Sequence, residues 1–272
     1  MRAAFQGEPG AYGEGAAIQY FGKSVETLPC RSFEEVFEKV ESGEVDRGVI
    51  PIENSLAGSI HRNYDLLIQH DLYIVGEINY RVEHNLLALR GVRLEDVRYV
   101  ISHPQALAQC ESFLKKLGVE KVSEYDTAGS AKKIKEMQLK DAAAIASRRA
   151  AEVYELEILA ESIEDDPENY TRFLVLAREE HVPAPGVPAK TSIVFSLKNT
   201  PGALFKALSV FALRDIDLTK IESRPIRGKK WEYFFYLDFA ASMNEEVGKN
   251  AIRHLGEIAT FLRILGSYPA DR

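Results

Sequence analysis

The sequence predicts an α/β protein whose main body has two lobes, followed by a smaller domain with the ferredoxin-like order βαββαβ. Two stretches of the first 180 residues alternate short apolar strands with amphipathic helices. The segment HVPAPGVPAK, His181 to Lys190, holds three prolines and a glycine, which block helix propagation and sheet pairing. The residues after it contain two helical and four strand-like segments, so a second domain is expected there.

The length of 272 residues also favours more than one domain, because single cores usually hold about 100 to 200 residues. We expect a body over residues 1–180, a linker over 181–189 and a tail domain over 190–272. The hydrophobic share of 46% and the charged share of 28% are those of an ordinary globular protein.

The composition argues against several classes of function. The net charge of -7 disfavours a nucleic-acid or anionic-membrane binder, and no run of about 18 apolar residues is present to span a bilayer. The two cysteines form no CxxC motif, and the start MRAAFQGEPGAYGEG lacks the apolar core of a signal peptide, so a cytoplasmic location is expected. The six histidines include no HxxxH pair, and we therefore expect no metal and no organic cofactor.

In the body, the first alternation predicts strands at Arg2 to Gln6, near Thr27 and at RGVIPIE, with helices near Glu14 to Phe21 and at Ser32 to Glu41. The second predicts strands at NLLALRG, VRYVISH, KVSEY and AAAIAS, with helices at Pro104 to Leu117 and Thr127 to Leu139. Such alternation is typical of mainly parallel sheets covered by helices, and α/β proteins bind ligands at the carboxyl ends of their strands. A cleft between two such lobes is the expected site.

In the tail, TSIVFSL is a strand, and NTPG is a turn in which Asn199 or Thr200 caps a helix with Pro201 at its first position. The segments DLTKIESRPI and WEYFFYLDF form a hairpin around RGKK. A second helix, NEEVGKNAIRHLGEI, and a last strand, TFLRILG, complete the order.

Three polar clusters lie at the ends of apolar strands of the body: Glu53-Asn54-Ser55, Ser102-His103-Pro104-Gln105 and Asn169-Tyr170-Thr171-Arg172. Each has a purely structural explanation, as a strand end, as a helix cap formed by Ser102 or His103, or as a strand start. Together they offer neutral hydrogen-bond donors, without a carboxylate pair or a nucleophile and its base. Such a site binds a polar small molecule and helps a group to depart.

These segments resemble the prephenate dehydratases that carry a C-terminal regulatory ACT domain. The resemblance covers nearly the whole chain and rests on GVIPIENSLAGSI, SHPQALAQC, AAAIASRRAAEVYEL, NYTRF, NTPGALFKAL and IESRP, in that order. It implies a carbon-oxygen lyase of phenylalanine biosynthesis that converts prephenate into phenylpyruvate, with loss of carbon dioxide and water and without a cofactor. It also implies a catalytic body of two lobes like a type II periplasmic binding protein.

The resemblance implies these site residues: Thr171 from the TRF motif, Asn54 and Ser55 from PIENS, Gln105 and Ser102 from SHPQ, and Arg172 as a carboxylate anchor. Loss of carbon dioxide is already driven by aromatisation, so the enzyme mainly has to make hydroxide a better leaving group. A hydroxyl is a weak acid, and Thr171 would act as a positioned donor. Strand alternation, however, points Arg172 away from the face of Thr171.

For the tail, the resemblance implies an ACT domain that binds L-phenylalanine as a feedback inhibitor at a subunit interface, in a homodimer or homotetramer. The expected effector residues are Asn199, Pro201, Gly202, Ala203, Leu204, Glu222, Ser223, Arg224 and Pro225.

Two alternatives remain at this stage. The stretch FQGEPGAYGEGAA resembles plant arogenate dehydratases, and Arg62 and Asn63 stand where many family members have a threonine nearby. Arogenate differs from prephenate by an amino group in place of the side-chain ketone, so the enzyme could use arogenate or both substrates. A different class is a non-catalytic amino-acid sensor that only binds ligands in its cleft and tail.

Overall fold

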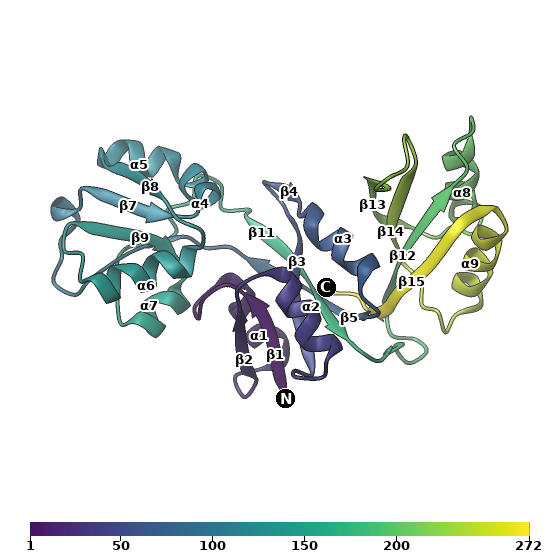
Figure 1. The fold of residues 1–272 in the computed structure, drawn as a ribbon, viewed down its shortest axis with the longest axis horizontal. Helices are drawn as coiled ribbons and strands as arrows, with labels where there is room; N and C mark the ends of the chain where they lie inside the picture. The colour runs from purple at the N-terminus through teal and green to yellow at the C-terminus, as the bar shows by residue number, and fades with distance from the viewer. Residues whose placement is uncertain (272) are drawn as a thin grey trace. The chain divides into compact units, whose positions relative to one another are not determined.

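The computed structural model describes residues 1–271 and contains three sheets (Figure 1). The first sheet has the order β2-β1-β3-β11-β5, with β4 paired to β3. Its strands are β1 (Arg2–Gln6), β2 (Glu26–Cys30), β3 (Arg47–Asn54), β4 (Gly58–Ser59), β5 (Tyr73–Arg81) and β11 (Tyr170–Ala177). Strand β1 pairs in parallel with β2 and β3, as the alternation of strands and helices predicted.

The second sheet has the order β10-β6-β9-β7-β8. Its strands are β6 (Asn85–Ala88), β7 (Tyr99–Ser102), β8 (Glu120–Ser123), β9 (Ala142–Ala146) and β10 (Glu157–Ala160). Strand β7 runs parallel to β8 and β9, whereas β6 is antiparallel to β9 and β10. This sheet is therefore mixed, with its parallel part where the sequence alternates strand and helix.

The helices of the body are α1 (Tyr12–Phe21), α2 (Phe33–Glu41), α3 (His61–Gln69), α4 (Pro104–Gln109), α5 (Glu111–Leu117), α6 (Thr127–Met137) and α7 (Arg148–Tyr154), with a short 3-10 turn η1 (Leu94–Asp96). The single helix expected over residues 104–117 is wrong. Cys110 lies between α4 and α5 with φ of -115° and ψ of 22°, outside the helical region, and this breaks the helix in two.

The second sheet has an apolar core on each face, because successive strand residues point to opposite sides. Leu87 and Ala144 pack with α6 residues Ala128 and Ala131 in one cluster. Their strand neighbours, such as Leu86 and Ile145, belong to the other cluster. The polar residues at the strand ends belong to neither of these apolar clusters, and the site is expected at those strand ends.

The tail domain has the ferredoxin-like order that the sequence predicts. It consists of β12 (Ala189–Leu197), α8 (Ala203–Ala212), β13 (Leu218–Pro225), β14 (Tyr233–Phe239), α9 (Glu246–Ile258) and β15 (Ala259–Pro269). The strand order is β13-β14-β12-β15, and every neighbouring pair is antiparallel. The expected cap is wrong: Gly202 is the residue before α8, with φ of 78°, and Pro201 lies outside the helix.

The chain divides into two compact units by its contacts. One unit comprises residues 1–39, 45–60 and 78–173, and the other comprises residues 40–44, 61–77 and 174–272. Helix α3 and most of β5 therefore group with the tail domain, through contacts such as the 2.7 Å bond from the Tyr236 hydroxyl to the Tyr64 carbonyl oxygen. The domain limits at residues 180 and 190 stay a prediction.

Among the helices in residues 1–271, none has the length and apolar character that a membrane span requires.

Candidate active site

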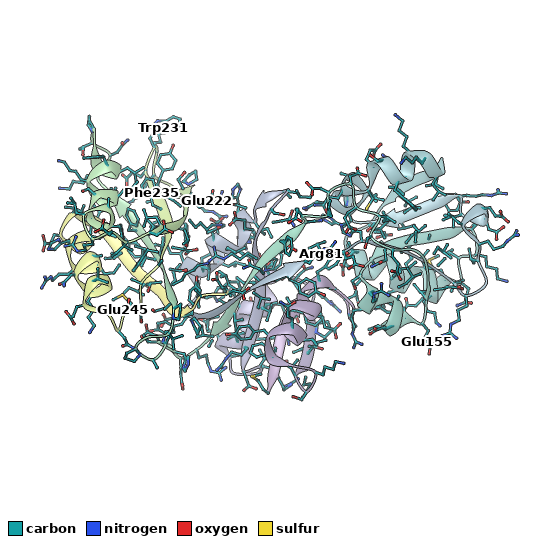
Figure 2. All side chains as sticks on the ribbon, turned by 180° about the vertical axis from the view of Figure 1, so that it is seen from behind. Arg81, Glu155, Glu222, Trp231, Phe235 and Glu245 are labelled. Carbon is teal, nitrogen blue, oxygen red and sulfur yellow. The ribbon has the colours of Figure 1, made fainter. Side chains whose placement is uncertain are left out.

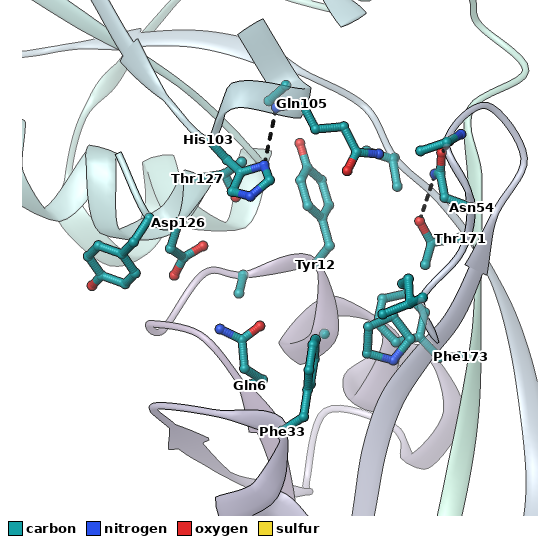
Figure 3. Close-up of a pocket in the computed structure, with 18 of the residues that line it drawn as sticks. Gln6, Tyr12, Phe33, Asn54, His103, Gln105, Asp126, Thr127, Thr171 and Phe173 are labelled. Carbon is teal, nitrogen blue, oxygen red and sulfur yellow. Dashed lines mark hydrogen bonds between the residues drawn. The ribbon is translucent and has the colours of Figure 1, made fainter. Parts of the chain in front are cut away.

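A cavity of about 510 Å³ lies in the first unit, within the usual range of roughly 300 to 1,000 Å³ for ligand pockets. It is lined by side chains of the first sheet and by side chains of the loops and helices that follow strands of the second (Figure 3). Those near the first sheet include Gln6, Tyr12, Asn54, Thr171 and Phe173, and those near the second include His103, Gln105, Gln109, Asp126 and Thr127. The polar clusters at the strand ends therefore meet at one cavity, as the sequence predicts.

Asn54 and Thr171 are joined at this cavity by a hydrogen bond whose direction is fixed. The backbone amides of Leu56 and Ala57 donate to Asn54 Oδ1 at 3.1 and 2.9 Å, so this oxygen is the acceptor. The opposite group, Nδ2, therefore donates, and it lies 2.9 Å from Thr171 Oγ1 and 2.8 Å from Asn169 Oδ1. An amide nitrogen accepts no hydrogen bond, so the hydroxyl proton of Thr171 remains available for a group in the cavity.

The same chain of hydrogen bonds continues from Asn169 to Tyr12. Because Asn169 Oδ1 accepts from Asn54, its Nδ2 donates to Gln109 Oε1 at 3.1 Å. Gln109 Oε1 then also accepts from His84 Nε2 at 2.9 Å, which places the imidazole proton on Nε2. The remaining ring nitrogen, Nδ1, is free to accept from the Tyr12 hydroxyl at 2.7 Å. The network thus assigns one tautomer to His84.

Burial keeps the two titratable groups at one end of this network, His84 and Tyr12, neutral. It lowers the pKa of His84, although the hydrogen bond to Gln109 and the charge of Glu164 raise it. Burial also raises the pKa of Tyr12 well above its usual value, as do the nearby acidic groups. The network is therefore a set of neutral donors and acceptors at neutral pH.

The other side of the cavity is acidic. Figure 3 shows Asp126 and His103 on one side of the Tyr12 ring, and Asn54 and Thr171 on the other. Asp126 caps α6 by accepting from the Ala128 amide at 3.2 Å, and burial raises the pKa of its carboxyl group. His103 caps α4 through its ring Nδ1, which accepts from the Gln105 amide at 3.2 Å, and burial lowers its pKa.

Two predicted site residues do not line the cavity, because their hydroxyls hold the backbone. Ser55 Oγ donates to the Glu168 carbonyl at 2.8 Å and accepts from the Tyr170 amide at 2.9 Å. Ser102 is fully buried and donates to the Ile145 carbonyl at 2.7 Å. Both serines support neighbouring strands and loops, whereas Asn54, Gln105 and Thr171 do face the cavity.

Arg172 also lies outside the lining, between the lining residues Thr171 and Phe173 on β11. Strand alternation points it to the opposite face, as the sequence indicated.

The lining residues that were not predicted include Tyr12, His84, Gln109 and Asp126. One signal for Gln109 was present, because it follows Gln105 by four positions and so shares its helical face.

A second cavity, of about 210 Å³, lies in the tail domain. It is lined by Leu197, Lys198, Asn199, Thr200, Gly202, Ala203, Leu204, Phe205, Trp231, Glu232, Tyr233 and Phe235. Figure 2 labels Trp231 and Phe235, two of the aromatic residues that the sequence reasoning missed.

Of the expected effector residues, Asn199, Gly202, Ala203 and Leu204 line this cavity, whereas Pro201, Glu222, Ser223, Arg224 and Pro225 do not. Glu222 Oε1 lies 3.4 Å from Nε2 of His61, at the start of α3. Arg224 pairs with Asp65 on the same helix at 3.2 Å. These two side chains of the IESRP motif therefore contact α3.

Within residues 1–271, no group of three or more His, Cys, Asp and Glu side chains is arranged to hold a metal ion.

Comparison with known proteins gives matches over both parts of the chain. The family model described as "Prephenate dehydratase" matches residues 3–181, and the model described as "ACT domain" matches residues 191–257. Arogenate dehydratase/prephenate dehydratase 2, chloroplastic, of Arabidopsis thaliana is 57% identical, over 100% of this chain and 73% of its own length. Arogenate dehydratase 2 of Petunia hybrida is 54% identical, over 100% and 72%.

Solved structures agree in fold. A prephenate dehydratase from Arthrobacter aurescens in complex with L-Phe is 32% identical, with a TM-score of 0.92 over 99% of this chain and 90% of that one. A protein described as a quorum quenching acylase, GqqA, is 37% identical, with a TM-score of 0.92 over 100% and 98%. The α/β body with a ferredoxin-like tail, which the sequence predicts, is thus confirmed.

The expected cytoplasmic location is wrong on this comparison, because several similar relatives are described as chloroplastic. Few cysteines and an acidic surface suit any reducing aqueous compartment, so composition alone does not distinguish the cytoplasm from a plastid.

Proposed function

Since the chain belongs to the prephenate dehydratase family, we propose that it removes water and carbon dioxide from prephenate, or from the related arogenate. This is a carbon-oxygen lyase reaction of phenylalanine biosynthesis. The observation that supports it most directly is the hydrogen bond from Asn54 to Thr171, which leaves the Thr171 proton for a group in the cavity.

Beyond this donor, the reaction needs few other catalytic groups. The bond between ring carbon and hydroxyl oxygen breaks towards oxygen, and the bond to the ring carboxylate breaks to release carbon dioxide and complete the aromatic ring. Thr171 passes its proton to the departing oxygen, which leaves as water, and the Asn54 amide stabilises the negative charge on Oγ1 until Oγ1 takes a proton back from solvent water. One such donor is typically worth a factor of roughly 100 to 1,000 in kcat.

The test is to incubate the protein separately with prephenate and with arogenate, following phenylpyruvate by absorbance and phenylalanine by chromatography. Turnover of either substrate supports the proposal. Saturable binding without turnover would favour the alternative of a non-catalytic amino-acid sensor.

For the two parts of the chain, we propose a catalytic domain over residues 1–180, a linker over 181–189 and an ACT domain over 190–272. The family matches at 3–181 and 191–257 support these limits.

The tail cavity is the proposed site for L-phenylalanine as feedback inhibitor. Its aromatic lining, Trp231, Tyr233 and Phe235, suits a phenyl ring, and the related Arthrobacter aurescens structure is a complex with L-Phe. Inhibition requires that L-phenylalanine bind a less active arrangement of the protein more tightly. Activity measured at rising L-phenylalanine concentration tests this.

A homodimer or homotetramer is proposed from the exposed apolar side chains of the tail domain. Phe205 and Trp231, which are 76% and 74% exposed, both line the tail cavity and so form an exposed apolar surface, and such surfaces mark sites of protein association. Light scattering that gives the monomer mass at assay concentration would contradict this.

A further inference from the structure

Asp126 is a buried carboxylate at the cavity without a cationic partner. It is 9% exposed, and its oxygens accept from three backbone amides, those of Glu8 at 2.9 Å, Ala128 at 3.2 Å and Gly129. Lys132, which is close in sequence, pairs instead with Glu8 at 3.1 Å. Throughout residues 1–271, no lysine or arginine forms an ion pair with Asp126.

The carboxylate retains capacity for a further donor. Two carboxylate oxygens together offer about four acceptor positions, and the amides of Glu8, Ala128 and Gly129 leave about one of them open. A buried, uncompensated charge is costly unless a cation or further donors satisfy it. An incoming cationic group would therefore gain a strong hydrogen bond at Asp126.

The rest of the cavity lining is also negative in formal charge. Glu34 is the other carboxylate there, and no lysine or arginine is among the described residues that line the cavity. Prephenate and arogenate both carry two carboxylates, but the arogenate side chain also carries an ammonium group. Arogenate is thus the less negative of the two substrates and meets less repulsion in this lining.

The position of Asp126 fits the geometry of the substrate. In both substrates the departing hydroxyl and the amino- or keto-acid side chain are attached at opposite ends of the ring. Figure 3 shows Thr171 and Asp126 on opposite sides of the Tyr12 ring within the cavity. A substrate whose hydroxyl faces Thr171 then directs its side chain towards Asp126.

We propose that Asp126 binds the ammonium group of arogenate and thereby makes this chain prefer arogenate to prephenate. The inference rests on the proposed dehydratase function. Asp126 is a specificity-determining residue in this account, because it contacts the ammonium group, which takes no part in either bond cleavage.

The experiment is to measure kcat and KM for both substrates with the wild-type protein, Asp126→Asn and Asp126→Ser. Asn and Ser also cap helices well, so both variants remove the charge while keeping a cap on α6. We expect wild type to prefer arogenate, and the variants to lower arogenate kcat/KM by about tenfold or more, mainly through KM. Prephenate kcat/KM should rise as repulsion is removed. Thermal unfolding checks that each variant is folded.

Glu34→Gln is the matched control, because it removes one negative charge from the same lining. It should change the ratio of the two kcat/KM values much less than Asp126→Asn. An equal change in both variants, an unchanged ratio in the Asp126 variants, or no wild-type preference for arogenate would overturn the role of Asp126 while the dehydratase function stands. If wild type turns over neither substrate, the proposed function fails, and the inference fails with it.

Discussion

The side-chain amide of Asn54 lies 2.9 Å from Thr171 Oγ1, although the two residues are 117 positions apart in the chain. The amides of Leu56 and Ala57 hold the Asn54 oxygen, and this fixes which end of the Asn54 amide faces Thr171. A loop of the first sheet therefore makes a threonine on β11 the acceptor in this bond and leaves its proton for another group.

Replacing Thr171 with Ala should lower kcat by a factor of about 100 or more while the protein stays folded, because the donor to the departing oxygen is lost. Thr171→Ser keeps a hydroxyl next to Asn54 and should retain more activity. Steady-state rates beside circular dichroism test both variants. A folded Thr171→Ala protein with near-normal kcat would exclude the donor role.

The buried His84 should make stability depend on pH. Burial lowers its pKa below the usual 6.5, so on acidification the unfolded chain takes up the proton first. The free energy of unfolding should therefore fall as the pH drops through 6.5, and this effect should level off below the folded-state pKa.

Denaturant unfolding of wild type and His84→Gln at several pH values measures this effect, and the variant should show a shallower fall. His103, whose pKa burial also lowers, is tested in parallel as His103→Gln to separate the two contributions. Identical pH profiles for wild type and His84→Gln would refute the assignment.

The ion pair between Glu77 and Lys190 should matter more to stability than a surface pair. The Glu77 side chain is fully buried and lies 2.7 Å from Lys190 Nζ. Lys190→Met removes this cation, while the Asp271 amide still donates to Glu77 Oε1 at 3.0 Å, and it should cost about 3 kcal/mol of unfolding free energy. The matched control is Lys249→Met, whose partner Glu246 is exposed, with an expected loss below about 1 kcal/mol.

Urea unfolding of both variants measures the two losses of unfolding free energy, and equal losses would show that burial of Glu77 is not the cause.

The contact between Glu77 and Lys190 also affects any truncation of the tail domain. Removing residues 190–272 takes away Lys190, so loss of inhibition in the shortened protein would be mixed with loss of stability. Point variants in the tail are therefore the cleaner test of regulation.

Gly202→Val should weaken L-phenylalanine binding. Gly202 lines the tail cavity with φ of 78°, where an L-residue costs roughly 1 to 2 kcal/mol, although no atom lies within 4 Å of an added Cβ. Gly186→Val is the control, since Gly186 has φ of 84°, equally open space and no place in the cavity lining. Calorimetric titration that gives both variants the same affinity would contradict the site.

The sequence predicted part of the candidate site because polar clusters lie at the ends of apolar strands. Asn54, Gln105 and Thr171 face the cavity for this reason. Ser55 and Ser102 come from the same clusters, but nearby carbonyl groups take their hydroxyls. A short hydroxyl bonds whichever backbone group the fold places beside it, and sequence spacing does not reveal that neighbour.

Local patterns determined the order of elements in this protein. Alternating apolar residues, helical periodicity and the proline-rich segment HVPAPGVPAK act over a few residues, through sterics and solvation, so they can be recognised without the fold. These patterns do not show where an element is interrupted. The single helix expected over residues 104–117 is interrupted at Cys110 and forms two helices.

Only the tertiary structure decided which distant side chains meet. It joined His84 to Gln109 and Asn54 to Thr171, placed Asp126 at the cavity, and grouped α3 with the tail domain. These contacts depend on how whole sheets and helices pack, and that packing is set by the sum of many weak burial and hydrogen-bond energies. This sum of energies cannot be worked out from any single stretch of the sequence.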